Sequence, residues 1–192
     1  MAIWLVRLAI DRWRQAENCK EGEGADAEPV ALIAETAHGP RIEAANRAGL
    51  EAGARKGMML ADARTLCPSL RAVPADPAGD LAFLERLAVW ARRWGPWSAL
   101  DPPDGLLVDV TAVAHLFGGE ERLLADAQER FARRGLAVRL AIAPTAGAAW
   151  ALAHYGAERA ILPPPARAPR RALRASLAGA ALRRADDGLG GL

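Results

Sequence analysis

Apolar residues along the chain fall into short continuous runs and into repeats with helical spacing, which together predict a mixed protein of strands and helices. The continuous runs predict strands at residues 3–8, 29–35, 106–110, 136–142 and 160–162. The helical repeats predict amphipathic helices at residues 76–94, 120–134 and 145–155, with shorter helices at 42–52 and 58–66. Gly53 and Gly57 separate the two short helices, and Pro68 ends the second.

The order of these elements predicts the fold class. From residue 76 the order is helix, strand, helix, strand, helix, and residues 3–8 add a strand at the start. Helices covering one face of a mainly antiparallel sheet are the expected packing for this order. We therefore predict a ferredoxin-like α+β core with an insertion after its first strand. Residues 18–28 are expected to form a polar surface loop, and prolines 163–165 a stiff linker.

Composition narrows the class of protein without deciding its function. The 192 residues are 52% hydrophobic and 25% charged, with a net charge of +2, which is ordinary for a globular protein. Lys20 and Lys56 are the only lysines, so the positive charge is almost wholly arginine. Arginine pairs bidentately with phosphate, but an arginine- and alanine-heavy composition also follows from a GC-rich genome.

The sequence also argues against membrane insertion, secretion and metal binding by cysteine or histidine. No apolar run approaches the roughly 20 residues that would span a bilayer, and no small-residue cleavage site follows the N-terminal run. Cys19 and Cys67 are too few and too far apart for a disulfide framework or a zinc site, and they suit a reducing cytoplasm. The three histidines, His38, His115 and His154, have no metal-ligand spacing.

Three segments carry a family resemblance. Residues 101–120 read DPPDGLLVDVTAVAHLFGGE, residues 53–68 read GARKGMMLADARTLCP, and residues 141–153 read AIAPTAGAAWALA. In this order and spacing they resemble motifs of the Y-family DNA polymerases. The form DGLLVDVT followed by HLFGGE resembles the ImuB group, whose members are regarded as accessory factors in bacterial damage-induced mutagenesis.

The resemblance implies a division of the chain. Residues 1–10 and 70–162 would form the palm, residues 11–69 the small inserted fingers, and residues 163–192 the start of a helical thumb. The chain stops at GLGGL, where a family thumb would still be incomplete and no little-finger domain follows. We therefore expect either a fragment or a truncated gene product.

The resemblance also places the metal-binding carboxylates, most of which are absent. Arg7 falls on the aspartate of the first strand and Ala9 on a second acidic position, while Asp104 and Gly105 fall on the Asp-Glu pair. A positive charge about 4 Å from a divalent ion is repelled by roughly 8 kcal/mol at an effective dielectric of about 20. Asp104 is thus a remnant. Asp109 and Asp101 are candidates to substitute for the missing carboxylates. Asp109, however, is expected on the opposite face of the strand, and Asp101 on a proline-containing loop.

The residues that would contact the triphosphate are also replaced. A Tyr and an Arg of the fingers pattern fall on Arg47 and Leu50, and two palm lysines fall on Ala146 and Trp150. We therefore expect no intact catalytic residue, no metal site and no cofactor. Mg²⁺ is expected only if the chain is an active polymerase.

Further arginines in the thumb segment suggest DNA contact. Arg167, Arg170, Arg171 and Arg174 recur at spacings that place them in one stripe on a helix. They are candidates for phosphate contact, with a plain solvated face as the alternative. Trp90, Trp94 and Trp97 occupy core-like positions and are expected to be buried.

Three functional hypotheses follow. The first is a non-catalytic scaffold in translesion synthesis whose partners, by resemblance, are DNA, an ImuA-type protein, an error-prone C-family polymerase and the sliding clamp. Most of those contacts would lie in the absent C-terminal region. The alternatives are a weak template-directed DNA polymerase and a truncated, non-functional gene product.

Overall fold

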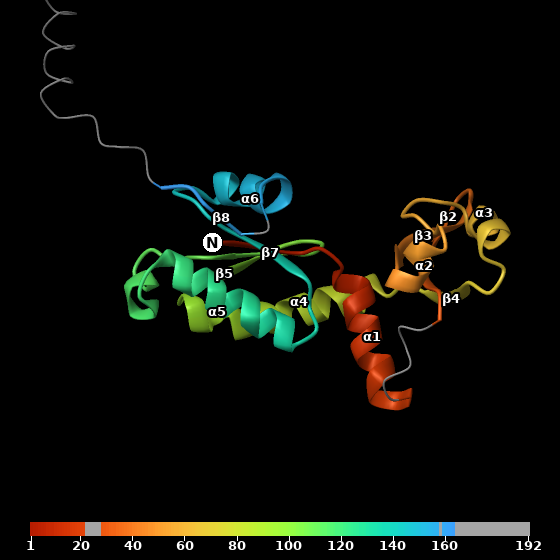
Figure 1. Cartoon of the computed structure of the whole chain (residues 1–192), viewed down its shortest axis with the longest axis horizontal. Helices are drawn as coiled ribbons and strands as arrows, with labels where there is room; N and C mark the ends of the chain where they lie inside the picture. Colours follow the sequence, from red (N-terminus) through yellow and green to blue (C-terminus); the bar gives the residue numbers. More distant parts are fainter. Residues whose placement is uncertain (22–27, 158, 164–192) are drawn as a thin grey trace, which may run out of the picture. The chain divides into compact units, whose positions relative to one another are not determined.

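The computed structural model describes residues 1–21, 28–157 and 159–163 (Figure 1). The elements in chain order are β1 (Ala2–Leu5), α1 (Leu8–Glu21), β2 (Val30–Thr36), β3 (Gly39–Ala45), α2 (Arg47–Glu51), α3 (Leu60–Leu66), β4 (Arg71–Pro74), α4 (Pro77–Ala91), the 3-10 helix η1 (Arg92–Trp94), β5 (Ser98–Asp101), β6 (Gly105–Val108), the 3-10 helix η2 (Ala114–Phe117), α5 (Glu120–Arg133), β7 (Val138–Ile142), α6 (Ala146–Tyr155) and β8 (Arg159–Ile161).

The larger sheet has the ferredoxin-like strand order. Its five strands lie in the order β5-β6-β1-β7-β8, with β1 in the centre. Ile3 of β1 lies opposite Leu106 of β6 on one side and Leu140 of β7 on the other, both in antiparallel pairing. Only the pairing of β7 with β8 is parallel. The predicted α+β class and mainly antiparallel sheet are therefore confirmed.

Both faces of this sheet are covered by helices, so the prediction that helices cover one face is wrong. Figure 1 shows α4 and α5 against one face and α6 against the other. The reason lies in β1, whose alternate side chains are apolar or aromatic on both faces. Ile3 and Leu5 join the core under α4 and α5, whereas Ala2 and Trp4 pack with residues of α6.

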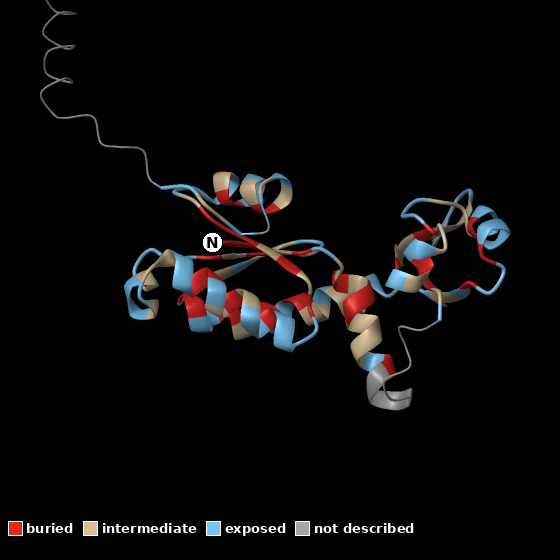
Figure 2. Cartoon of the chain, in the orientation of Figure 1, coloured by how far each residue is buried: buried red, intermediate tan, exposed pale blue. Residues whose placement is uncertain are grey.

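The α4/α5 face holds the main core (Figure 2). Trp94 and Phe131 are fully buried, with ring centroids 5.5 Å apart. The inward-facing residues of the two predicted helices are buried: Leu84, Leu87, Ala88, Ala91, Trp94, Leu123, Leu124, Ala127 and Phe131. The expected burial of Trp94 is thus confirmed, whereas Trp90, also expected to be buried, is half-buried. Trp97 was expected to be buried as well, but it is 74% exposed because it precedes β5 at the edge of the sheet.

A second, smaller sheet is built from the inserted segment, in the order β3-β2-β4, and has a core of its own. Here the predicted helix at residues 42–52 is wrong, because residues 39–45 form β3 and only Arg47–Glu51 are helical. Ile42 pairs with Ile33 of β2. The Asn46 side chain accepts hydrogen bonds from the backbone N–H of Gly49 and of Val30, which starts the helix after the strand.

Helix α1 was not predicted, and it extends through residues 18–21, which were expected to lie in a loop. Its sequence is too polar to show a helical repeat. Contacts with distant segments stabilise it instead: Asp11 accepts a hydrogen bond from the Ala137 N–H, and Gln15 donates one to the Arg134 carbonyl. The short strands β4 and β5 were missed as well.

Other predictions fall outside the described residues. The thumb segment beyond Pro163 is outside them, including Arg167, Arg170, Arg171 and Arg174. The boundaries assigned to palm, fingers and thumb stay predictions. Among the described helices, none has the length and apolar character needed to cross a bilayer.

Candidate functional site

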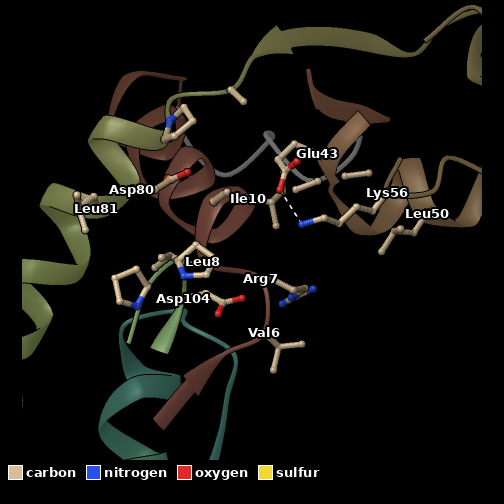
Figure 3. A pocket seen from close by; sticks show the side chains of 17 residues that line it. Val6, Arg7, Leu8, Ile10, Glu43, Leu50, Lys56, Asp80, Leu81 and Asp104 are labelled. Carbon is tan, nitrogen blue, oxygen red and sulfur yellow. Dashed lines mark hydrogen bonds and ion pairs between the residues drawn. The ribbon is translucent and has the colours of Figure 1, made fainter. Parts of the chain in front are cut away.

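A cavity of about 470 Å³ lies where the end of β1, the turn between β5 and β6, and the smaller sheet come together (Figure 3). Most of its wall is apolar and includes Val6, Leu8, Leu50 and Leu81. The charged residues that line it are Arg7, Glu43, Lys56, Asp80 and Asp104. Arg7, Leu50 and Asp104, three of the residues singled out in the sequence, therefore share one cavity.

Arg7 follows β1 and is tied to a buried carboxylate. Its Nη2 lies 3.4 Å from Oδ1 of Asp11, one turn further along the chain. The side chain of Asp11 is only 3% exposed, whereas that of Arg7 is 39% exposed. Arg7 thus helps to neutralise a buried charge, which would be costly to leave uncompensated. A guanidinium has only donors, so it cannot coordinate a metal ion.

Asp104 is held by the central strand. Its Oδ2 accepts a hydrogen bond of 3.1 Å from Nε1 of Trp4. Its backbone carbonyl accepts a second hydrogen bond, of 2.8 Å, from the N–H of Leu5. The half-buried carboxylate therefore satisfies an indole donor of β1 while still lining the cavity.

Gly105 begins β6 at a crowded point. It pairs with Trp4 across the two strands and with Asp101 across the β5–β6 hairpin. A Cβ atom at this position would lie 2.8 Å from the carbonyl oxygen of Asp101 and 2.8 Å from its Oδ2. Real Cβ atoms do not come this close to backbone oxygen, so any larger residue at position 105 requires the hairpin to shift.

The remaining carboxylates near the cavity are already paired. Asp80 accepts a hydrogen bond of 2.5 Å from Nε of Arg12, and Glu43 accepts one of 2.6 Å from Nζ of Lys56 (Figure 3). Within the described residues no three Asp, Glu, His or Cys side chains are grouped closely enough to hold a metal ion. The donor set around the cavity therefore does not fit the two-ion centre that the family resemblance implies.

The two aspartates considered as substitutes are placed elsewhere. Neither Asp101 nor Asp109 is among the residues that line the cavity. Asp109 accepts a hydrogen bond of 3.0 Å from the N–H of Thr111. Bonds from the side chain and backbone of Thr111 lower the pKa of Asp109. Its carboxylate is thus used in the turn after β6.

The expected triphosphate positions are not brought together. Leu50 lines the cavity, but Arg47 and Trp150 do not. Arg47 lies on α2 with a 79% exposed side chain, and its Nε is 3.7 Å from Oε1 of Glu51. An exposed pair at this distance contributes little to stability.

Trp150 belongs to a feature that the sequence analysis missed. Its ring stacks on that of His154, with centroids 4.1 Å apart and planes at 26°. His154 stacks in turn on Trp4, with centroids 4.4 Å apart and planes at 19°. The only sequence signal was the spacing of Trp150 and His154, four residues apart on α6. We call Trp4, His154 and Trp150 the aromatic column; its inner member is the residue that donates to Asp104.

Comparisons with known proteins agree with this architecture. Over 108 residues the chain is 50% identical to Protein ImuB of Caulobacter vibrioides strain NA1000 / CB15N, and the match covers 56% of the chain and 24% of that relative. Protein ImuB of strain ATCC 19089 / CIP 103742 / CB 15 matches equally. The matched region thus spans about a quarter of the length of these relatives.

Solved structures share the fold. A post-insertion binary complex of Dbh DNA polymerase matches with a TM-score of 0.67 at 18% identity, over 85% of this chain and 48% of that one. DinB from Sulfolobus solfataricus matches with a TM-score of 0.61 at 19% identity, over 85% of this chain and 49% of that one. The impB/mucB/samB family model matches residues 19–154. The resemblance to Y-family polymerases and to the ImuB group is confirmed, and the chain belongs to the impB/mucB/samB family.

Proposed function

We propose that the chain is a non-catalytic accessory protein of the DNA-damage response, in which the polymerase palm and fingers serve as a folded platform during translesion synthesis. One observation carries this proposal. Arg7, at the position expected for the first metal-binding aspartate, lines the cavity beside Asp104 and is paired with the buried Asp11.

The chemistry of nucleotide transfer also supports a non-catalytic role. Two divalent ions need several carboxylates within a few Å, and Mg²⁺ seldom binds to one carboxylate without substrate phosphates. Asp104 is the one carboxylate expected to remain, and it already accepts a hydrogen bond from Trp4. At position 105 the space next to the backbone is occupied by Asp101. We propose no metal and no cofactor for this chain.

Partners are proposed from the relationship to ImuB. They are DNA, an ImuA-type protein, an error-prone C-family polymerase and the sliding clamp. Most of these contacts would be made by regions that correspond to parts of ImuB outside the quarter matched by this chain. The four thumb arginines, Arg167, Arg170, Arg171 and Arg174, remain candidates for contact with DNA phosphates. A cytoplasmic location is proposed on the basis of the two cysteines, Cys19 and Cys67.

Primer extension on a primed template tests the proposal. We expect no nucleotide incorporation with Mg²⁺ or Mn²⁺, and the same result for Asp104→Ala and for the matched control Asp109→Ala, whose carboxylate lies outside the cavity. Incorporation that is lost in Asp104→Ala but kept in Asp109→Ala would overturn the scaffold proposal. It would establish the second candidate, a weak template-directed polymerase, which is favoured by the position of Asp104 on the cavity wall.

A cell-based measurement separates the remaining candidates. Deleting the gene should lower the frequency of damage-induced mutations, and restoring either the parent chain or Asp104→Ala should recover it. Recovery by the parent alone would favour the polymerase. A deletion without effect would favour the truncated, non-functional gene product.

A further inference from the structure

The aromatic column ends in a ring that is open to solvent. Trp4, the inner member, lies on the central strand of the sheet, and His154 is enclosed between two indoles. Trp150, the outer member, is 37% exposed. Tyr155 stands beside it, 81% exposed, with its ring centroid 6.0 Å from that of Trp150 and its plane turned by 72°. Tyr155 therefore forms a rim beside the outer end of the column.

The column is held rigidly at its base. Nε1 of Trp4 donates to Asp104, and Nδ1 of His154 lies 2.9 Å from the carbonyl oxygen of Trp150. The guanidinium of Arg139 lies over the Trp4 ring, 5.6 Å from its centroid, and donates to the carbonyls of His154 and Gly156. Fixed ring planes reduce the ordering cost of stacking another ring on top.

Beside the carboxylate of Asp104 at the inner end of the column, the charged side chains on the neighbouring elements are positive. Arg139 lies on β7 and the exposed Arg159 on β8, and the elements α6, β7 and β8 contain no Asp or Glu. Glu158 is outside the described residues. Apart from Tyr155, the exposed residues near Trp150 on α6 are small, namely Ala146, Gly147 and Ala151. They provide little apolar area for a protein partner, but they leave room for a flat ring.

We propose that the exposed face of Trp150 is a stacking site for a base of single-stranded nucleic acid, with Tyr155 beside it and Arg139 and Arg159 providing positive charge for the backbone. Every base has a π-face, so such a site is tolerant of sequence. Stacking needs no metal ion, so this proposal is independent of the proposed lack of polymerase activity and can be tested separately.

Binding of a single-stranded oligothymidylate of about ten nucleotides to the full chain tests this site, followed by fluorescence anisotropy at low salt. We expect Trp150→Leu to weaken binding roughly 5- to 150-fold, as loss of one stacked base does. Trp150→Phe should retain part of the affinity. Trp97→Leu is the matched control, because Trp97 is 74% exposed at the β5 edge of the sheet and outside the column, and it should bind like the parent.

A second measurement does not depend on how well the variants fold. Ultraviolet cross-linking of the parent chain to an oligonucleotide containing bromodeoxyuridine should attach the base to Trp150 or Tyr155. The proposal is overturned if Trp150→Leu binds as tightly as the parent, if the parent shows no saturable binding, or if cross-links form only elsewhere. In each of these cases a contact with a protein partner would become the better explanation for the exposed face of Trp150.

Discussion

The core under α4 and α5 and the site around Arg7 and Asp104 lie on the same five-stranded sheet but differ in how far their residues fit the polymerase pattern. In the core, the inward residues of α4 and α5 are buried apart from the half-buried Trp90, and Trp94 and Phe131 are fully enclosed. At the site, Arg7 stands where a metal ligand is expected and is committed to Asp11. Gly105 stands where a second ligand is expected and has no room for a side chain.

The difference follows from what each region requires. A core needs apolar side chains of suitable total volume, and many sequences meet that requirement. A metal site needs particular atoms within a few Å of one point, so one substitution can remove it. The same fold can therefore be kept by sequences with and without such a metal site, which is why fold alone does not establish activity.

The largest expected effect breaks the core. Phe131→Ala should lower the free energy of unfolding by about 3–5 kcal/mol, because Phe131 is fully buried against Trp94 and Trp90. Chemical denaturation measures this. Trp97→Ala, which removes a large but exposed ring, should change the free energy by no more than about 0.5 kcal/mol. Equal losses in the two variants would mean that this core does not dominate stability.

A second change tests the crowding at the site. Gly105→Ala should destabilise the protein by about 1–3 kcal/mol, because its Cβ would meet the carbonyl oxygen of Asp101. Gly147→Ala is the matched control: its Cβ would meet no atom within 4 Å, and alanine at this helical position should stabilise by a few tenths of a kcal/mol, up to about 1. Thermal unfolding measures both changes in stability, the loss in Gly105→Ala and the gain in Gly147→Ala. A Gly105→Ala variant as stable as the parent would contradict the crowding argument.

A third change tests the present role of Asp104. Asp104→Ala leaves the Nε1–H of Trp4 without its acceptor. It should lower the free energy of unfolding by about 1–2 kcal/mol. This is the lower part of the range for an unsatisfied donor, because Trp4 is only half-buried. Asp104→Asn keeps an oxygen acceptor and should cost less. Near-ultraviolet circular dichroism should report a looser Trp4 in the alanine variant alone. Equal losses for both variants would show that the charge, and not the hydrogen bond, matters.

The smallest expected effect is a pH dependence at Asp126, a half-buried residue beside the core. Burial by itself raises the pKa of Asp126, but hydrogen bonds from Trp94 and Arg130 outweigh it and lower that pKa overall. A carboxylate with a lowered folded-state pKa contributes stability above its unfolded pKa of about 3.9. That contribution is lost as the pH falls through the folded pKa.

Asp126→Asn should therefore be less stable than the parent at neutral pH, by less than about 1 kcal/mol, and the gap should close below about pH 4. Unfolding followed as a function of pH measures this. The matched control is Glu129→Gln, since Glu129 forms an exposed pair with Arg133 and its removal should leave the profile nearly unchanged. A gap that widens on acidification would contradict the assigned direction of the shift.

Prediction from sequence succeeded where a repeat was long and failed where it was short or polar. Helices α4 and α5 were predicted because their apolar faces recur over four turns. Helix α1 was missed because its sequence is polar and its stability comes from contacts with the α5–β7 region. Strand β3 was mistaken for a helix because residues 42–52 mix apolar and polar positions without a clear period.

The sequence by itself determined the family, the order of the core elements apart from β5, and the absence of carboxylates at positions 7 and 105. These depend only on which residue stands at which position. Only the tertiary structure decided that Arg7 shares a cavity with Asp104, that Asp101 fills the space beside Gly105, and that Trp4, His154 and Trp150 stack in one column. Such contacts join residues as far as 150 positions apart, as in the stack of Trp4 on His154, and no local pattern records which distant side chains the strand pairing will bring together.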